Sequence, residues 1–258
     1  MTRVLAAITL VAGFATVSAQ NLTPGCQNAL KNIAANQDAA ACLTPAALVG
    51  IAATNSSTSL VGPIGNWLDS LCGVSPCSNS TLDFVVSTLT SGCSAELSLV
   101  GYTSDQQSNI EAVVRQYYPT VRKVVCLKDG NDNCITKTLK AVESVVGPLS
   151  IDNLAKIITG SSNLNSSAIP KEVYCSDCTK AQYNIINKEI PNAFDGSKSD
   201  ITQQCGSSFV DGQDPSGITQ SAVASPSKGN AAHMLSAFPD TSATYAFLAV
   251  AGLFAMAA

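Results

Sequence analysis

Ten cysteines constrain this chain more than any other feature of its sequence. An even number of cysteines behind a secretory signal is typical of a disulfide framework formed in an oxidising compartment. We therefore expect all of them to be structural. They are Cys26, Cys42, Cys72, Cys77, Cys93, Cys126, Cys134, Cys175, Cys178 and Cys205.

The positions of the cysteines limit how the bridges can be arranged. Any cut between Cys93 and Cys126 leaves five cysteines on each side. If all ten are oxidised within one chain, an odd number of bridges must cross that cut, so at least one bridge joins the two halves. Hundreds of pairings remain open. Candidates include a local Cys126–Cys134 bridge, with Cys26 and Cys42 joining successive helices and the later cysteines of each half making the link.

The spacing of Cys175 and Cys178 in "CSDC" matches a redox C-x-x-C motif. An active motif needs a thiolate of low pKa at the start of a helix in a βαβ unit. The surroundings here are helical and eight other cysteines compete, so we expect structural bridges. We expect no metal and no cofactor, because zinc sites use unoxidised thiols and histidines.

Both ends of the chain have the pattern of processing signals. Residues 1–19 contain one basic residue, Arg3, followed by an apolar run and small residues, which predicts a signal peptide cleaved after Ala19. The other end has small residues at 230–232, a spacer from His233 to Ala243 and an apolar tail to Ala258. This order predicts a glycosylphosphatidylinositol anchor attached at Asn230. The propeptide 231–258 would then remove His233, the only histidine of the chain.

From Gln20 to residue 210 the apolar residues follow helical periodicity. One stripe consists of Ile110, Val113, Val114, Tyr117 and Tyr118; a second of Ile135, Leu139, Val142 and Val146; a third of Leu82, Val86, Leu89 and Cys93. Such spacing places each set on one helix face. Helix starts are expected at Thr44, Ser80 and Ser104, and stops at Gly92, Gly147 and Gly160. We predict an all-α, disulfide-stapled bundle of about eight short helices.

Two further patterns concern the organisation of the chain. "SLVGPI" at 59–64 recurs as "SVVGPL" at 144–149, and cysteines follow both in the same order, which is consistent either with two duplicated half-domains or with coincidence. Residues 211–230 are rich in Ser, Gly and Pro. They predict a flexible stalk, with an ordered tail packed on the domain as the alternative.

The segments "YYPTVRKVVCLKDG", "YCSDCTKAQYN" and "CGSSFVDGQDPSGI" carry a family resemblance. In these segments the chain is similar to a family of fungal secreted, cysteine-rich proteins of unknown function, many of them glycolipid-anchored. The similarity spans Cys26 to Ile218, with cysteine framing as its main signature. The resemblance implies a fungal cell-surface setting and brings no catalytic or binding residues.

Several residue groups have some of the features of a binding or catalytic site. The loop "DGNDN" partly matches a calcium loop, but Cys134 and Lys140 stand where glycine and glutamate belong, so we favour a polar turn. Trp67 is expected in the core rather than on a sugar-binding surface. An ordinary helix surface is favoured over a basic, aromatic patch for Arg115, Tyr118, Arg122 and Lys123. Carboxylates that could meet as a hydrolytic pair are Asp69, Asp83, Glu96, Glu143 and Asp152, and their spacing selects no pair.

The expected function follows from these signals. N-x-S/T sequons at Asn21, Asn55, Asn79 and Asn165 predict a surface glycoprotein. A net charge of −4 does not suit nucleic-acid binding. We expect a non-enzymatic, GPI-anchored protein on the outer face of the plasma membrane or in the cell wall, with a structural, adhesive or interaction role toward glycans or surface proteins. A carrier of a lipid or small apolar ligand is the alternative, and a carboxylate-dependent hydrolase is less favoured.

Overall fold

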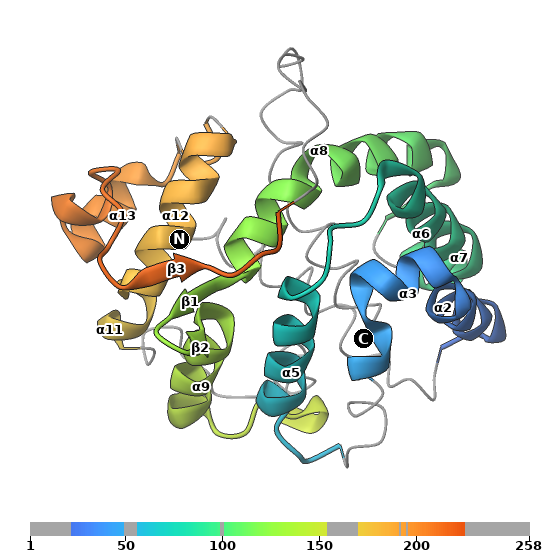
Figure 1. Ribbon diagram of the computed structural model, residues 1–258, viewed down its shortest axis with the longest axis horizontal. Helices are drawn as coiled ribbons and strands as arrows, with labels where there is room; N and C mark the ends of the chain where they lie inside the picture. Colours follow the sequence, from blue (N-terminus) through green and yellow to red (C-terminus); the bar gives the residue numbers. More distant parts are fainter. Residues whose placement is uncertain are drawn as a thin grey trace.

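The computed structural model describes residues 22–48, 56–98, 101–153, 170–190, 192–194 and 196–224 of the chain. These residues are mostly helical, with one small sheet that lies on one side of the molecule (Figure 1). The helices of the first half are α2 (Pro24–Ala35), α3 (Gln37–Leu43), η1 (Pro45–Leu48), α5 (Val61–Cys72), α6 (Asn79–Gly92) and α7 (Ser94–Ser98). Those that follow are η2 (Ser104–Gln106), α8 (Gln107–Val125), α9 (Cys134–Val146), α11 (Lys171–Tyr174), α12 (Asp177–Glu189), α13 (Lys198–Cys205) and η4 (Ser207–Phe209).

The strands are β1 (Leu127–Asp129), β2 (Asp132–Asn133) and β3 (Ile218–Gln220). They pair antiparallel in the order β2-β1-β3, with Lys128 opposite Asn133 on one side and Thr219 on the other. The predicted all-α, disulfide-stapled fold is confirmed, with this sheet as an addition. There are more α-helices than the eight or so expected, because short helices such as α3, α7 and α11 carry no stripe of their own.

The predicted stripes lie on helices. In α6, Leu82, Val86 and Leu89 are buried and pack against α2 and α8. In α8, Val114 and Tyr118 are buried in the same cluster, and the helix continues through Pro119 to Val125. The stripe of α9 is only half-buried, because the helix inserts Cys134 and Thr136 into the core instead.

Side-chain caps mark the starts of helices, and glycines mark two of their ends. The cap of α6 is Ser78 rather than the expected Ser80: its Oγ accepts the Thr81 N–H at 3.1 Å. Thr103 and Gln106 form a capping box before α8, one residue ahead of the expected Ser104. The stops at Gly92 and Gly147 are confirmed, and Gly160 lies outside the described residues.

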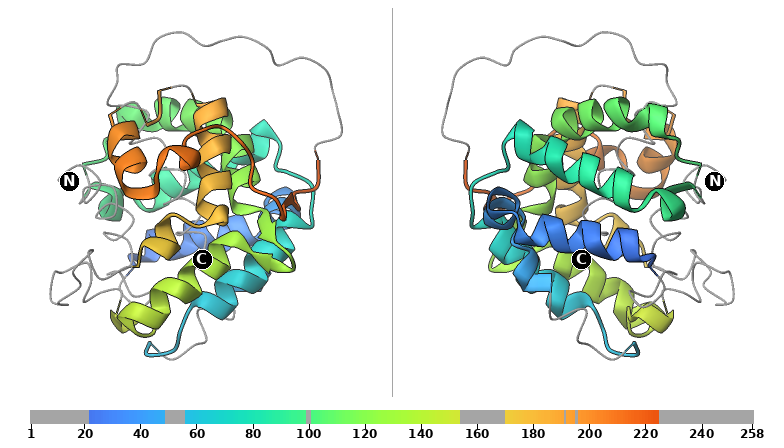
Figure 2. Two further views of the ribbon diagram at one scale, coloured as in Figure 1. Left: turned by 90° about the vertical axis from the view of Figure 1, so that its left-hand side faces the viewer. Right: turned by 90° about the vertical axis from the view of Figure 1, so that its right-hand side faces the viewer.

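The largest core cluster lies in the first half. There α2 and α6 pack closely because Gly92 faces Ala29: a Cβ at Gly92 would lie 2.4 Å from the Cβ of Ala29. The Cys26–Cys93 bridge fixes this contact from the same two helix ends. Two smaller clusters surround Trp67 and, in the second half, Cys134. Helices α5 and α9 lie side by side below α8 and connect the halves (Figures 1 and 2).

The chain beyond Asp211 is ordered farther than predicted. Residues 218–220 form β3, and the N–H groups of Ser221 and Val223 then donate to the carbonyls of Cys126 and Cys72, at 3.0 Å each. The predicted stalk boundary at 211 is therefore wrong, since residues 211–224 pack on the domain. Their composition looked like a linker because β3 is an edge strand with exposed side chains, which needs no apolar stripe.

The two similar hexapeptides have different local structures. "SLVGPI" runs into the start of α5, whereas "SVVGPL" ends α9 and continues into the following loop. They do lie together, because the Leu60 N–H donates to the Leu149 carbonyl at 3.0 Å. This difference gives no support to duplication.

Candidate functional site: a polar pocket and the joint between the halves

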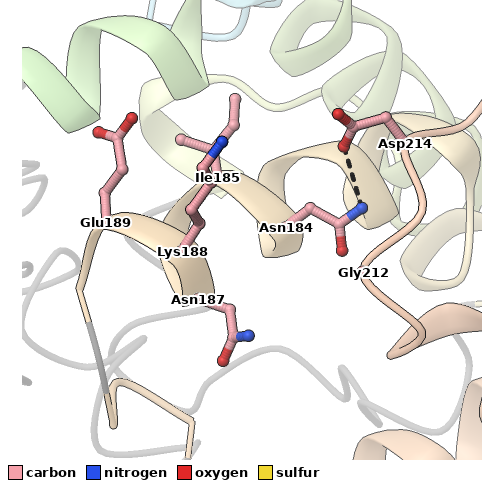
Figure 3. A pocket seen from close by; sticks show the side chains of 7 residues that line it. All are labelled: Asn184, Ile185, Asn187, Lys188, Glu189, Gly212 and Asp214. Carbon is pink, nitrogen blue, oxygen red and sulfur yellow. Dashed lines mark hydrogen bonds between the residues drawn. The ribbon is translucent and has the colours of Figure 1, made fainter.

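A pocket of about 320 Å³ opens between α12 and the loop that follows η4. Its lining residues are Asn184, Ile185, Asn187, Lys188, Glu189, Gly212 and Asp214 (Figure 3). All but Ile185 and Gly212 have polar or charged side chains. The volume is at the small end of the range for ligand sites, which is about 300 to 1,000 Å³.

The loop wall of the pocket is fastened to α12. The Asn184 Nδ2 donates to the Gln213 carbonyl at 2.9 Å and to Asp214 Oδ1 at 3.1 Å (Figure 3). One turn earlier in the helix, Lys180 forms an ion pair with Asp211 at 2.9 Å. The side-chain hydrogen bond from Lys180, with the backbone N–H of Gln213, holds the pKa of Asp211 below its ordinary value. The loop is thus held in place without a ligand.

The opposite wall is fastened to α8. Glu189 accepts from Thr120 Oγ1 at 2.8 Å and from Lys123 Nζ at 2.5 Å. The two pocket carboxylates, Glu189 and Asp214, are therefore both bonded to protein donors. A general acid or base must instead be free to exchange a proton with its substrate. The lining suits weak contact with a polar molecule better than acid–base chemistry.

The structure pairs all ten cysteines. The bridges are Cys26–Cys93, Cys42–Cys77, Cys72–Cys126, Cys134–Cys178 and Cys175–Cys205. The expected cross-half link is confirmed as a single bridge. The local Cys126–Cys134 pairing is wrong, because Cys126 reaches back to α5 while Cys134 reaches forward to α12. Cys26, in α2, bonds to Cys93 at the end of α6 rather than to Cys42. The two cysteines of "CSDC" bond to different partners, which confirms a structural role.

The cross-half bridge lies in a dense polar contact, which we call the joint: Cys72, Arg122, Cys126 and residues 221–223. The Arg122 side chain is 5% exposed; it donates to the Leu71 carbonyl at 2.8 Å and to the Val74 carbonyl. Leu71 lies in the last turn of α5, where backbone acceptors lack partners within the helix, and Val74 lies two residues beyond the end of α5. The arginine therefore caps α5 from α8, beside the bridge that ties the same two elements.

The basic, aromatic patch does not form. Arg115 pairs with Asp83 at 2.9 Å, and Lys123 pairs with Glu189. Tyr118 is buried, and its hydroxyl accepts the Cys77 N–H at 2.9 Å. The expectation of an ordinary helix surface is thus wrong for Tyr118 and Arg122, because α8 crosses the interior and both of its faces contact other helices. Trp67 is buried as expected, with its Nε1 donating to the Leu43 carbonyl at 2.8 Å.

The carboxylates weighed as a hydrolytic pair each have a separate partner. Asp69 pairs with Lys128, Glu143 accepts the Leu149 N–H, and Asp152 accepts from Ser56 Oγ. Within the "DGNDN" loop, Asn133 caps α9 by accepting the Ile135 and Thr136 N–H groups, which confirms the polar turn. In the part of the chain that the structure describes, no group of three or more His, Cys, Asp or Glu residues is placed to hold a metal.

Glu96 is the one buried carboxylate of the set, at 8% exposure. Its Oε1 accepts the Thr23 N–H at 2.7 Å, just before α2 begins. Burial alone would raise the pKa of Glu96, but hydrogen bonds from Thr23 and from the backbone of Glu96 outweigh it and hold the pKa below its ordinary value of 4.5. The charged form is therefore the one that fits the fold.

We expect Glu96→Gln to lower the free energy of unfolding at pH 7, because an amide is a weaker acceptor for the Thr23 N–H. A lowered folded-state pKa stabilises the fold above the unfolded-state pKa and loses that contribution as pH falls through the folded value. The difference between Glu96→Gln and the wild type should therefore shrink below pH 4.5. Denaturant unfolding at several pH values measures it. A difference that stays constant down to pH 2 would contradict this role.

Of the predicted glycosylation sites, Asn79 lies in the described part. It is exposed at the start of α6, so a glycan there would project into solvent. Asn21, Asn55 and Asn165 lie outside the described residues, as do the signal peptide, Asn230 and His233. The described helices include none that is both long enough and apolar enough to span a bilayer.

Comparisons of the chain with protein-family models, with curated proteins and with solved structures find no match.

Proposed function

We propose that the protein is a non-enzymatic ectodomain of the fungal cell surface, held by a glycosylphosphatidylinositol anchor, with a structural, adhesive or interaction role. The observation that supports this most is the joint. All ten cysteines are bridged, and the last described residues bond to both cysteines of the bridge that links the halves. A head tethered by its carboxyl end would then be held at the point where its two halves meet.

The pocket beside α12 favours an interaction role over the alternatives. Five of its seven lining residues have polar or charged side chains, whereas a carrier would enclose a lipid or another apolar ligand in an apolar cavity. Both of its carboxylates are bonded to protein donors, which does not suit a hydrolase. A hydrolytic activity abolished by Glu189→Gln or Asp214→Asn would contradict the non-enzymatic role.

The anchor is tested by expressing the full chain in a fungal host. We expect phosphatidylinositol-specific phospholipase to move the protein from the membrane to the soluble fraction, because a lipid alone would hold it. A chain ending at Ala243 lacks the apolar tail and serves as the control; it should not be attached to the membrane. Retention of the full chain in the membrane after phospholipase treatment would contradict the anchor.

A further inference from the structure

Residues 218–224, which we call the C-terminal strap, run past Cys72 and Cys126, and residues 221–223 of the strap belong to the joint. The strap begins as β3, where Thr219 pairs with Lys128 of β1. Ser221 then donates to the Cys126 carbonyl twice, from its N–H at 3.0 Å and from its Oγ at 2.7 Å. Val223 donates from its N–H to the Cys72 carbonyl at 3.0 Å. Two residues of the strap therefore contact both ends of a single disulfide.

The disulfide whose two backbone carbonyls accept hydrogen bonds from the strap differs from the other four. It alone connects the two halves of the chain, whereas each of the others closes a loop within one half. Cys72 is 1% exposed and Cys126 is fully buried. A reductant must reach a sulfur atom to cleave the bond. Access to this bridge therefore depends on what covers it.

The strap is held by hydrogen bonds and by a half-buried apolar contact from Ile218 to the Cys134 cluster. β3 is a three-residue edge strand, and its Thr219 and Gln220 side chains are exposed. Val223 is 42% exposed, and the loop before the strap is exposed at Gly212, Asp214 and Gly217. Short edges with few buried apolar contacts open at much lower cost than the whole fold. The strap can therefore leave while α5 and α8 stay packed.

We propose that Cys72–Cys126 is a redox-sensitive site whose accessibility is controlled by the C-terminal strap. When the strap is released, an external dithiol attacks one sulfur as its thiolate and forms a mixed disulfide. This attack releases the other cysteine as a thiolate. The second thiol of the dithiol then attacks the dithiol sulfur in the mixed disulfide and displaces the bound cysteine, so the dithiol becomes a cyclic disulfide and both cysteines become thiols. The product keeps four bridges and loses the only disulfide between the halves.

The position of the strap gives this site a further consequence, which rests on the proposed anchor. Tension between an anchored carboxyl end and a partner held by the head would act on the strap before it reached the helices. Loading of the tether would then favour reduction of the bridge. The redox proposal itself needs neither the anchor nor the surface location, so it is tested on the purified chain.

The test compares variants of residues 20–224 that differ in the N–H donors of the strap. Ser221→Pro with Val223→Pro removes both donors to the bridged cysteines, because proline has no N–H. The matched control, Ser221→Ala with Val223→Ala, keeps both. Each protein is treated with dithiothreitol under native conditions, free thiols are alkylated at intervals, and mass spectrometry follows Cys72 and Cys126, with Cys26 and Cys93 as the internal reference.

We expect the proline variant to lose the Cys72–Cys126 bridge about 10- to 30-fold faster than the alanine variant, since each lost backbone hydrogen bond favours the open form roughly fivefold. Cys26–Cys93 should react at an unchanged rate. Equal rates for the two variants would overturn the proposal, and so would acceleration of all five bridges together, which indicates global unfolding. If the proline variant does not fold, a chain ending at Gly217, which lacks the strap, is tested instead. Selective reduction of Cys72–Cys126 in this chain supports control of access by the strap. Failure of this chain to fold as well shows that the strap is not detachable and overturns the proposal.

Discussion

Replacing Cys72 and Cys126 together by alanine is expected to lower the free energy of unfolding by about 4 kcal/mol, the largest loss for any single bridge outside the α2–α6 contact. The bridge spans a separation of 54 residues. Cross-linking a loop of that length removes about 4 kcal/mol of chain entropy from the unfolded state at 25 °C. Both cysteines are also buried in the joint.

Denaturant unfolding at neutral pH measures this loss. The control is Cys175→Ala with Cys205→Ala, which removes a bridge of 30-residue separation between half-exposed cysteines. Its loop is shorter, and the same relation gives a slightly smaller loss of about 3.6 kcal/mol. The two pairs also differ in where they act: only the Cys72 and Cys126 pair should lower the cooperativity between the halves. A Cys72→Ala, Cys126→Ala protein within 1 kcal/mol of the wild type would contradict the importance of the joint.

Arg122→Ala is expected to cost about 3 to 5 kcal/mol, because it leaves one buried and one half-buried carbonyl at and just beyond the end of α5 without a donor and opens a cavity beside the bridge. The carbonyls are those of Leu71 and Val74. Arg122→Lys should recover part of the loss, since an ammonium can donate to one carbonyl but cannot match the planar fork of the guanidinium.

The same helix offers a matched control for this substitution. Arg115 lies two turns earlier in α8, and its side chain is 39% exposed in an ion pair with Asp83. Exposed pairs contribute about 0 to 1 kcal/mol, so Arg115→Ala should be nearly neutral. Thermal or urea unfolding of both variants gives the comparison. Equal losses for Arg115→Ala and Arg122→Ala would show that Arg122 acts as a surface residue.

The helices were predictable because their signals are local. The stripe through Leu82, Val86 and Leu89 has the period of a helix, and all three residues are buried on α6. Gly92 and Gly147 ended the helices that they were expected to end. The parity of the cysteines also required a covalent link between the halves, whatever the pairing.

The sheet and the joint were not predictable, because they depend on long-range contacts between short segments. Strands of two or three residues have no measurable alternation, so β1, β2 and β3 left no signal. Ser221 and Val223 bond to residues far away in the sequence, and their Ser- and Ala-rich surroundings look like a linker. Parity could not identify Cys72 and Cys126 as the linking pair, since that choice depends on the C-terminal ends of α5 and α8 meeting in space.

The pocket was missed for a related reason. Asn184 lies in a polar stretch of α12, and nothing near it in the sequence marks it as a site. Its role follows from hydrogen bonds to Gln213 and Asp214, 29 and 30 residues later. The segment that carries those two residues had been assigned to a stalk. Even a correct boundary would have placed Gln213 and Asp214 in the ordered domain without showing that α12 is the helix that they contact.

The covalent link between the halves is tested most directly by cutting the chain and asking whether it separates. Arg115, Arg122 and Lys123 are poor places to cut, since all three lie within α8 and Arg122 is buried. A protease recognition sequence is better inserted after Gly101, which is exposed ahead of α8. After cleavage, the wild type should run as one band on a denaturing gel without reductant and as two bands with it, whereas Cys72→Ala with Cys126→Ala should give two bands in both. A cleaved wild-type chain that separates without reductant while no free thiol is detected would contradict the joint.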